Sequence, residues 1–210
     1  MTHEAFVIGE SNERAVRTMK AWVGSSEPFL AICGPQGSGK THLAHILADM
    51  MGGRYLRLGA DDADSLLSSA ADAVTDDADL AASPKSLLAA MEAAAGAGRR
   101  LVLAGRGEPH DWAKGLKDLE TRLNAAPRIT LAEPDEALLR AVMAKLFSDR
   151  QLRASEQIAD YAAHRIEKTF VAAQRFVAAL DAASIETGQP IGLKLAREII
   201  ANLSEAPLNA

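Results

Sequence analysis

Residues 29–43 read Phe29-Leu30-Ala31-Ile32-Cys33-Gly34-Pro35-Gln36-Gly37-Ser38-Gly39-Lys40-Thr41-His42-Leu43. The stretch begins with a short apolar run, which is typical of a strand buried on both faces of a parallel sheet. A glycine-rich segment follows, and Leu43, Ile46 and Leu47 then recur at helical spacing. A buried strand, a glycine-rich loop and a helix in this order predict an α/β domain with a parallel sheet.

The segment from Gly34 to Thr41 satisfies the pattern G-x-x-x-x-G-K-[ST] at every position. Small residues let successive backbone N–H groups converge on anionic oxygens, and the following helix adds its positive N-terminal end. Lys40 would bind the β- and γ-phosphates, and Thr41 would supply a hydroxyl ligand for Mg²⁺. We therefore expect a nucleoside di- or triphosphate to contact Gly34, Pro35, Gln36, Gly37, Ser38, Gly39, Lys40 and Thr41. The pattern predicts binding rather than hydrolysis, and the alternative is a glycine-rich turn without a ligand.

A second acidic group is needed at the end of a neighbouring strand, where a carboxylate can hold Mg²⁺ through water. The candidates are Asp76 and Asp77, which follow a short expected strand at residues 73–75. Asp76 would organise the metal together with Thr41, and Asp77 would polarise the attacking water. The alternative is a solvated acidic loop, since the expected strand contains alanine and threonine and further aspartates lie nearby.

Strand and helix patterns alternate along the chain up to Pro134. Further strands are expected at residues 54–58, 101–104 and 129–131, and helices at residues 14–23, 43–50, 85–95 and 116–123. The segment between residues 105 and 115 reads as a loop, in which Trp112 is a candidate interface residue. Helical stripes then follow at residues 138–147, 158–166, 171–185 and 193–203. We expect a nucleotide-binding α/β core at residues 1–133 and a small all-helical domain at residues 134–210.

Composition limits the classes of function. The 210 residues carry 23 Lys and Arg against 28 Asp and Glu, a formal net charge of -5, which argues against gripping nucleic acid across a whole face. The single cysteine excludes an intramolecular disulfide. The N-terminus shows no secretory signal pattern, and no run of about 18 apolar residues occurs, so we expect a cytoplasmic protein without a membrane span.

Three stretches resemble the AAA+ ATPases of the DnaA family, and within it the shorter Hda-type regulators of alphaproteobacteria. They are Phe6-Val7-Ile8-Gly9-Glu10-Ser11-Asn12, the loop and helix start from Gly34 to Leu43, and Gly115-Leu116-Lys117-Asp118-Leu119-Glu120-Thr121-Arg122-Leu123. The helical end from Thr187 to Glu198 is similar to the end of a DnaA-type lid. The resemblance covers nearly the whole chain and implies an AAA+ P-loop core followed by a helical lid. The DNA-reading domain of DnaA itself is not expected here.

The resemblance also implies residue roles and partners. Val7 and Ile8 would touch the adenine, and His42 would close the phosphate motif. Lys168 would substitute for a lid arginine, and the alternative is an ordinary exposed lysine. Arg122 falls on the family's arginine finger, which reaches a nucleotide on a neighbouring subunit. Such a regulator binds ADP or ATP with Mg²⁺, and in its ADP form, with the DNA-loaded sliding clamp, it stimulates hydrolysis of ATP held by DnaA. DnaA and the clamp are thus the implied partners, a homodimer is a further expectation, and sequence-specific DNA binding is not expected.

The sequence departs from the family pattern at three places. Arg106 stands where DnaA-like chains usually carry an aspartate, so its guanidinium would either reach the γ-phosphate region or pair with Asp76 or Asp77. Val171 aligns with the lid arginine. Because of the residues at these two positions, we expect intrinsic ATP hydrolysis to be weak or absent. The third departure concerns the clamp, since the glutamine-leucine peptide with which such regulators bind it is not found before Phe6.

Alternatives stay open for the arginine and for the function. Arg122 could form a surface ion pair with Asp118 or Glu120 instead of acting as a finger. The protein could be a nucleotide-gated adaptor that recruits a replication protein without stimulating hydrolysis. A small-molecule kinase is the third hypothesis, which the terminal helical segments disfavour because a kinase lid should carry arginines that close over a second substrate.

Overall fold

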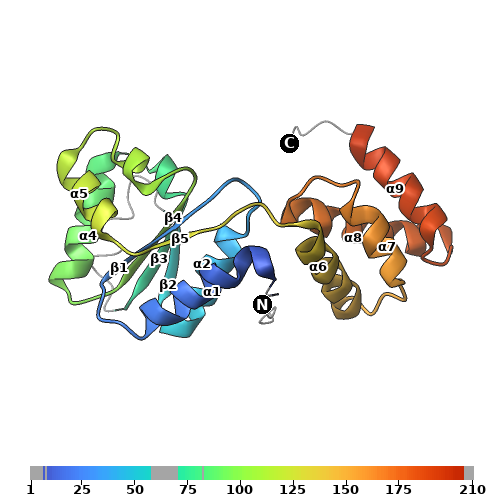
Figure 1. The fold of residues 1–210 in the computed structure, drawn as a ribbon, viewed down its shortest axis with the longest axis horizontal. Coiled ribbons are helices and arrows are strands. Elements are labelled where there is room, and N and C mark those ends of the chain that lie inside the picture. The colour runs from blue at the N-terminus through green and yellow to red at the C-terminus, as the bar shows by residue number, and fades with distance from the viewer. Residues whose placement is uncertain (1–6, 8, 58–70, 82, 206–210) are drawn as a thin grey trace. The chain divides into compact units, whose positions relative to one another are not determined.

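The computed structural model describes residue 7 and residues 9–57, 71–81 and 83–205 (Figure 1). By its internal packing the chain divides into two compact units. Residues Asn12–Ala132 belong to the first unit, and the chain from Glu133 belongs to the second together with Val7–Ser11. The prediction that residues 1–133 and 134–210 form two separate domains stays a prediction.

The first unit is built around a five-stranded parallel sheet of order β2-β3-β4-β1-β5. Its strands are β1 (Phe29–Cys33), β2 (Arg54–Arg57), β3 (Ala73–Asp76), β4 (Leu101–Gly105) and β5 (Arg128–Thr130). In the register, Cys33 lies opposite Gly105 and Thr130, and Arg57 lies opposite Asp76. Because the strands are parallel, their carboxyl ends meet along one edge, where β1 enters the glycine-rich loop.

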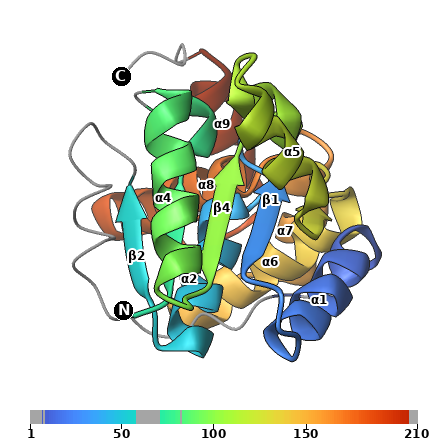
Figure 2. The same cartoon turned by 90° about the vertical axis from the view of Figure 1, so that its left-hand side faces the viewer.

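Helices cover both faces of this sheet, as Figure 2 shows. The helices α1 (Glu10–Val23) and α2 (Lys40–Met51) pack on one face, and α4 (Pro84–Gly96) and α5 (Lys117–Ala125) pack on the other. Alternate strand residues supply the two cores, so that Leu30 and Ile32 face α1 and α2 while Ala31 and Cys33 face α4 and α5. This arrangement confirms the predicted α/β fold class.

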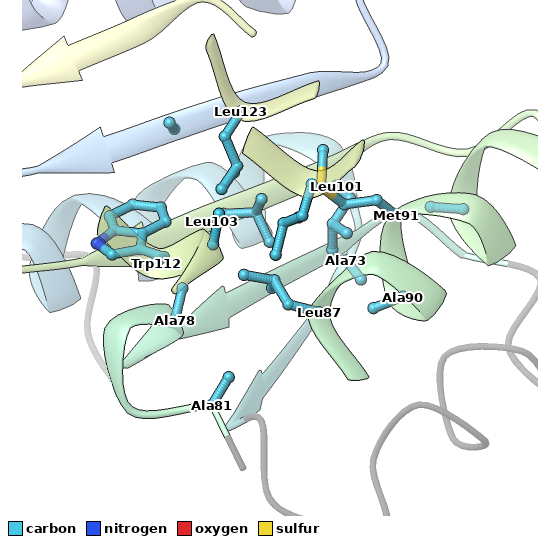
Figure 3. Close-up of a cluster of buried hydrophobic side chains, with 14 of the residues drawn as sticks. Ala73, Ala78, Ala81, Leu87, Ala90, Met91, Leu101, Leu103, Trp112 and Leu123 are labelled. Atoms are coloured by element: carbon cyan, nitrogen blue, oxygen red, sulfur yellow. The ribbon is translucent and has the colours of Figure 1, made fainter. Parts of the chain in front are cut away.

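The core under α4 and α5 is closed by a tryptophan (Figure 3). Trp112 lies in a 3₁₀ helix, η2 (Pro109–Ala113), and the residue is 3% exposed. It packs in one cluster with Leu87 of α4, Leu103 of β4 and Leu123 of α5. The indole N–H donates to the carbonyl of Arg106 at 2.6 Å. The segment is therefore not a simple loop, and Trp112 is not available as an interface residue, because burying its large apolar ring is more favourable.

The second unit contains the helices α6 (Glu136–Asp149), α7 (Glu156–Ala163), α8 (Phe170–Thr187) and α9 (Leu193–Glu205). Their apolar stripes meet in one core that includes the fully buried Phe176. The Asp135 carboxylate caps α6 by accepting from the Leu138 amide at 2.7 Å, and the Thr169 hydroxyl caps α8. Over the described residues, no helix is both long and apolar enough to cross a membrane.

Candidate functional site

The glycine-rich loop connects the end of β1 to the start of α2 at the carboxyl edge of the sheet. Gly34 begins the loop with φ +154°, and a Cβ at this position would lie 2.3 Å from the carbonyl oxygen of Leu131. Leu131 is the residue directly after β5. It is held in place because its amide donates to the Cys33 carbonyl at 2.8 Å. Only glycine therefore fits at the point where the chain leaves the sheet.

Lys40 is the first residue of α2, and only 9% of its surface is exposed. Its ammonium donates to the carbonyls of Gly34 at 2.9 Å and Pro35 at 2.6 Å, so it folds back over the loop. Burial lowers the pKa of Lys40, the charge of Asp76 opposes this shift, and the charge of Arg106 adds to it. The side chain is thus a desolvated cation held at the centre of the loop.

The loop fits a phosphate group by the chemistry of its donors. A lysine ammonium has three N–H donors, so the two bonds of Lys40 leave one donor for a ligand. The Ser38 hydroxyl is buried and has no hydrogen-bond partner among the described residues, and a buried hydroxyl is costly to leave unpaired. The N-terminus of α2, which begins at Lys40, adds the positive end of a helix dipole. These donors surround one loop, as a nucleoside di- or triphosphate requires.

Asp76 is the last residue of β3, and it is buried, with 3% of its surface exposed. Its Oδ2 accepts a hydrogen bond from the Thr41 hydroxyl at 2.6 Å and another from the Tyr55 hydroxyl at 2.8 Å. Its Oδ1 accepts from the amide of Asp77 at 2.9 Å. The structure therefore brings together Thr41 and Asp76, the two residues expected to hold Mg²⁺, and hydroxyl and carboxylate oxygens are ligands that this ion prefers.

The chain after Asp76 turns sharply. Asp77 has φ 56°, and the 3₁₀ helix η1 (Ala78–Leu80) begins directly after it. The Asp79 carboxylate accepts from the backbone amide of Arg106 at 2.9 Å. This hydrogen bond connects the segments that follow β3 and β4. The Arg106 side chain is exposed, and in the described part of the chain no ion pair joins it to Asp76 or Asp77. That alternative is therefore wrong for this structure, since the backbone rather than the side chain of Arg106 meets an aspartate.

Arg122 lies in the last turn of α5, and its side chain is 37% exposed. Its guanidinium pairs with the Glu92 carboxylate of α4 at 3.4 Å. The expected alternative partners, Asp118 and Glu120, are not the ones found in the described chain, because the packing of α4 against α5 brings Glu92 to the arginine. The finger role of Arg122 stays a prediction.

The other expected ligand contacts are distributed between the two units. His42 is a partly buried residue of α2. Val7 belongs to the second unit, and Ile8 lies outside the described residues. Lys168, also of the second unit, pairs with Glu136 at 3.3 Å, and its side chain is 53% exposed. The nucleotide contacts of these residues stay predictions.

Tyr55 is the site residue that sequence reasoning missed. It lies in β2, next to β3 in the sheet, and its ring stacks on His45 of α2 with centroids 3.9 Å apart. The only signal in the sequence is a tyrosine inside a short expected strand. Its hydroxyl contact to Asp76 depends on which strands are neighbours, which local patterns do not specify.

No protein-family model matches this chain, and no curated protein sequence matches it. The fold is similar to that of domain III of the Thermotoga maritima replication initiation protein DnaA, with TM-score 0.80, 17% identity, and coverage of 96% of this chain and 95% of that chain. The Thermotoga maritima RuvB Holliday junction branch migration motor has TM-score 0.74 and 18% identity, with 93% of this chain and 70% of that chain covered. The replication initiator DnaA bound to AMPPCP and single-stranded DNA has TM-score 0.68 and 17% identity, with coverage of 85% and 63%. These likenesses show that the chain shares the fold of DnaA domain III and of RuvB.

Proposed function

We propose that this protein is an Hda-like regulator of replication initiation. It is a cytoplasmic AAA+ module that binds ADP or ATP with Mg²⁺ and stimulates hydrolysis of the ATP held by DnaA. The observation that carries the proposal is the likeness to DnaA domain III, which extends over 96% of this chain and 95% of that domain. The DNA-loaded sliding clamp is the second proposed partner, and a homodimer is a further proposal, in which two copies would pair through the surface that carries the nucleotide.

Nucleotide binding is supported by the geometry of the loop and of its metal-binding pair. Lys40 would bind the β- and γ-phosphates, and the hydroxyl of Thr41, at 2.6 Å from Asp76, would face Mg²⁺. A DnaA initiator of this fold is known with AMPPCP bound, which supports an adenine nucleotide as the ligand. Asp77, with its φ of 56° beside Asp76, would orient water in any slow hydrolysis by the protein itself.

The role in trans is supported by the setting of Arg122. Its ion pair with Glu92 is 3.4 Å long and partly exposed on both sides. Exposed pairs of this kind contribute about 0–1 kcal/mol, so the guanidinium can leave Glu92 for a phosphate on a partner at little cost. An arginine supplied in trans stabilises the charge that develops on the transferred phosphoryl group and raises the rate about 10³–10⁵-fold in well-studied cases.

The decisive experiment measures hydrolysis of ATP preloaded on the cognate DnaA, with clamp-loaded DNA and this protein in its ADP form. Arg122→Ala is compared with Arg128→Ala, which removes another exposed arginine that is paired with Glu108 at 2.7 Å in the same unit. Glu92→Gln is a further variant that releases Arg122 without removing it. ADP binding by each variant is measured in parallel.

We expect stimulation by the wild type, by Arg128→Ala and by Glu92→Gln, and its loss in Arg122→Ala with ADP binding intact. Equal stimulation by Arg122→Ala would refute the finger. A wild type that binds nucleotide and DnaA without stimulating hydrolysis would refute the regulator and indicate the adaptor instead. Failure to bind any adenine nucleotide would refute the proposal at its first step.

A further inference from the structure

The Asp76 carboxylate is held by three different parts of the first unit. Thr41 of α2 and Tyr55 of β2 both donate to Oδ2, at 2.6 and 2.8 Å. The backbone amide of Asp77 donates to Oδ1 at 2.9 Å. This carboxylate accepts hydrogen bonds from a helix, from the neighbouring strand and from the amide of the next residue. Its orientation is therefore determined before a metal binds.

The hydrogen bonds also limit how this carboxylate can meet a metal. An ionised carboxylate offers about four acceptor sites, two on each oxygen. Both sites of Oδ2 are used by Thr41 and Tyr55, and one site of Oδ1 is used by the Asp77 amide. The site that is left on Oδ1 suits a water molecule in the shell of Mg²⁺, an ion that usually keeps several of its waters.

Tyr55 is itself fixed in position. Its strand pairs with β3, where Tyr55 lies opposite Val74, and its ring packs against the core under α1 and α2. The ring also stacks on His45 with an interplanar angle of 17°. His45 lies four residues after Thr41, so both face the same side of α2. One face of α2 thus orients Asp76 twice, directly through Thr41 and indirectly through the His45 and Tyr55 rings.

We propose that Tyr55 is a positioning residue of the nucleotide site, whose hydroxyl holds Asp76 so that the carboxylate receives a Mg²⁺-bound water. This inference rests on the proposed binding of a magnesium nucleotide and extends it to a residue outside the phosphate loop. Groups that hydrogen-bond to direct metal ligands orient them, and their removal typically lowers metal affinity about 10–100-fold. Because Asp76 would meet the metal through a water, we expect the lower end of this range for Tyr55. Tyr55 acts through Asp76 and has no contact of its own with the nucleotide in this proposal.

The test measures the dissociation constant of AMPPCP with Mg²⁺ and with EDTA. The ratio of the two constants is the enhancement of nucleotide binding by Mg²⁺. Tyr55→Phe keeps the aromatic ring for the His45 stack and removes only the hydroxyl. The matched control is Tyr161→Phe, because this other tyrosine belongs to α7 of the second unit. Asp76→Asn and the double variant Tyr55→Phe/Asp76→Asn complete a double-mutant cycle, and near-ultraviolet circular dichroism checks the folding of each.

We expect Tyr55→Phe to reduce the Mg²⁺ enhancement about tenfold, with no change in the dissociation constant measured in EDTA. Tyr161→Phe should keep the wild-type enhancement. In the Asp76→Asn background, Tyr55→Phe should have no further effect, because the two residues act as one unit.

Two results would overturn the inference while leaving nucleotide binding in place. One is an unchanged enhancement in Tyr55→Phe. The other is an equal loss of affinity with Mg²⁺ and with EDTA, which would indicate a general structural role of the hydroxyl. A wild type that binds AMPPCP without any Mg²⁺ enhancement would overturn the metal site of the proposed function itself, and the inference with it.

Discussion

Replacing Gly34 with alanine adds a methyl group where the fold leaves no room for one. The added Cβ would lie 2.3 Å from the Leu131 carbonyl oxygen and 2.9 Å from the Ser38 hydroxyl oxygen, at a φ of +154°. The carbonyl cannot easily retreat, since its residue is bonded to Cys33 of β1 through the Leu131 amide at 2.8 Å. Glycine is therefore required at position 34 by its contact with Leu131 at the end of the sheet, and not by nucleotide binding.

The expected loss of stability has two parts. A backbone conformation that other residues rarely adopt costs about 1–3 kcal/mol. Inserting a methyl group into a closely packed site costs about 1–3 kcal/mol more. Gly34→Ala should thus lower the free energy of unfolding by about 2–6 kcal/mol, a large part of the roughly 5–15 kcal/mol typical of a domain. Gly115→Ala is the matched control, because its φ is +88° but nothing lies within 4 Å of the added Cβ.

Tryptophan fluorescence during denaturation by guanidinium chloride is the suitable assay. Trp22 and Trp112 are the only tryptophans of the chain, and both belong to the first unit, so the signal reports on that unit. Gly115→Ala should lose about 1–2 kcal/mol from backbone strain alone. If Gly34→Ala, free of nucleotide, is no less stable than Gly115→Ala, the contact with Leu131 is not what requires glycine and the argument fails.

Further predictions concern single side chains. Lys40→Met should weaken ADP binding about 10–100-fold, measured by calorimetry, because hydrogen bonds to a charged group contribute about 1.5–3 kcal/mol. Since burial lowers the pKa of Lys40 below its usual 10.5, the unfolded chain keeps that proton to higher pH, so the wild type should gain stability relative to Lys40→Met as pH rises toward 10.5. Burial also raises the pKa of the Cys33 thiol, so iodoacetamide should modify the native protein far more slowly than the unfolded one at pH 8, as judged by mass spectrometry. Trp112→Phe should lower the free energy of unfolding, measured by thermal denaturation, by at least about 0.5–1.5 kcal/mol, because it removes the hydrogen bond from the indole N–H to the Arg106 carbonyl, and a change near zero would argue against that bond. Asp135→Ala should cost the second unit about 0.5–2 kcal/mol through loss of the α6 cap, measured by circular dichroism.

Much of the first unit could be predicted because its signals are local. The run Phe29–Cys33 is apolar throughout and is observed as β1, and the loop after it carries its glycines and lysine at fixed spacing. The strand that ends at Asp76 was predicted from a weak pattern, with alanine and threonine in place of larger aliphatic residues. It is observed as β3, because these side chains are small enough to be buried between neighbouring strands. The helices of the second unit show clear apolar stripes, and all of those expected are observed.

The partners of the site residues could not be predicted in the same way. Tyr55 and Asp76 are 21 positions apart, and Arg122 and Glu92 are 30 positions apart. These pairs meet because β2 lies beside β3 and α4 packs against α5, and neither adjacency leaves a periodic pattern in the sequence. The prediction that Trp112 is an interface residue was wrong for the same reason, since a tryptophan in an apparent loop gives no sign of the distant residues that it packs against.

The sequence by itself determined the strand, glycine-rich loop and helix around residues 29–51, the strand that ends at Asp76 and the α/β class, because each follows from residue type and spacing within a short segment. The binding of phosphate and Mg²⁺ at these residues stays a prediction. Only the tertiary structure decided that Leu131 forces a glycine at Gly34, that Tyr55 holds Asp76, and that Glu92 rather than Asp118 or Glu120 meets Arg122. The physical reason is that the order of parallel strands is set by how the helices cover both faces of the sheet, and that order determines which distant side chains come within hydrogen-bonding distance.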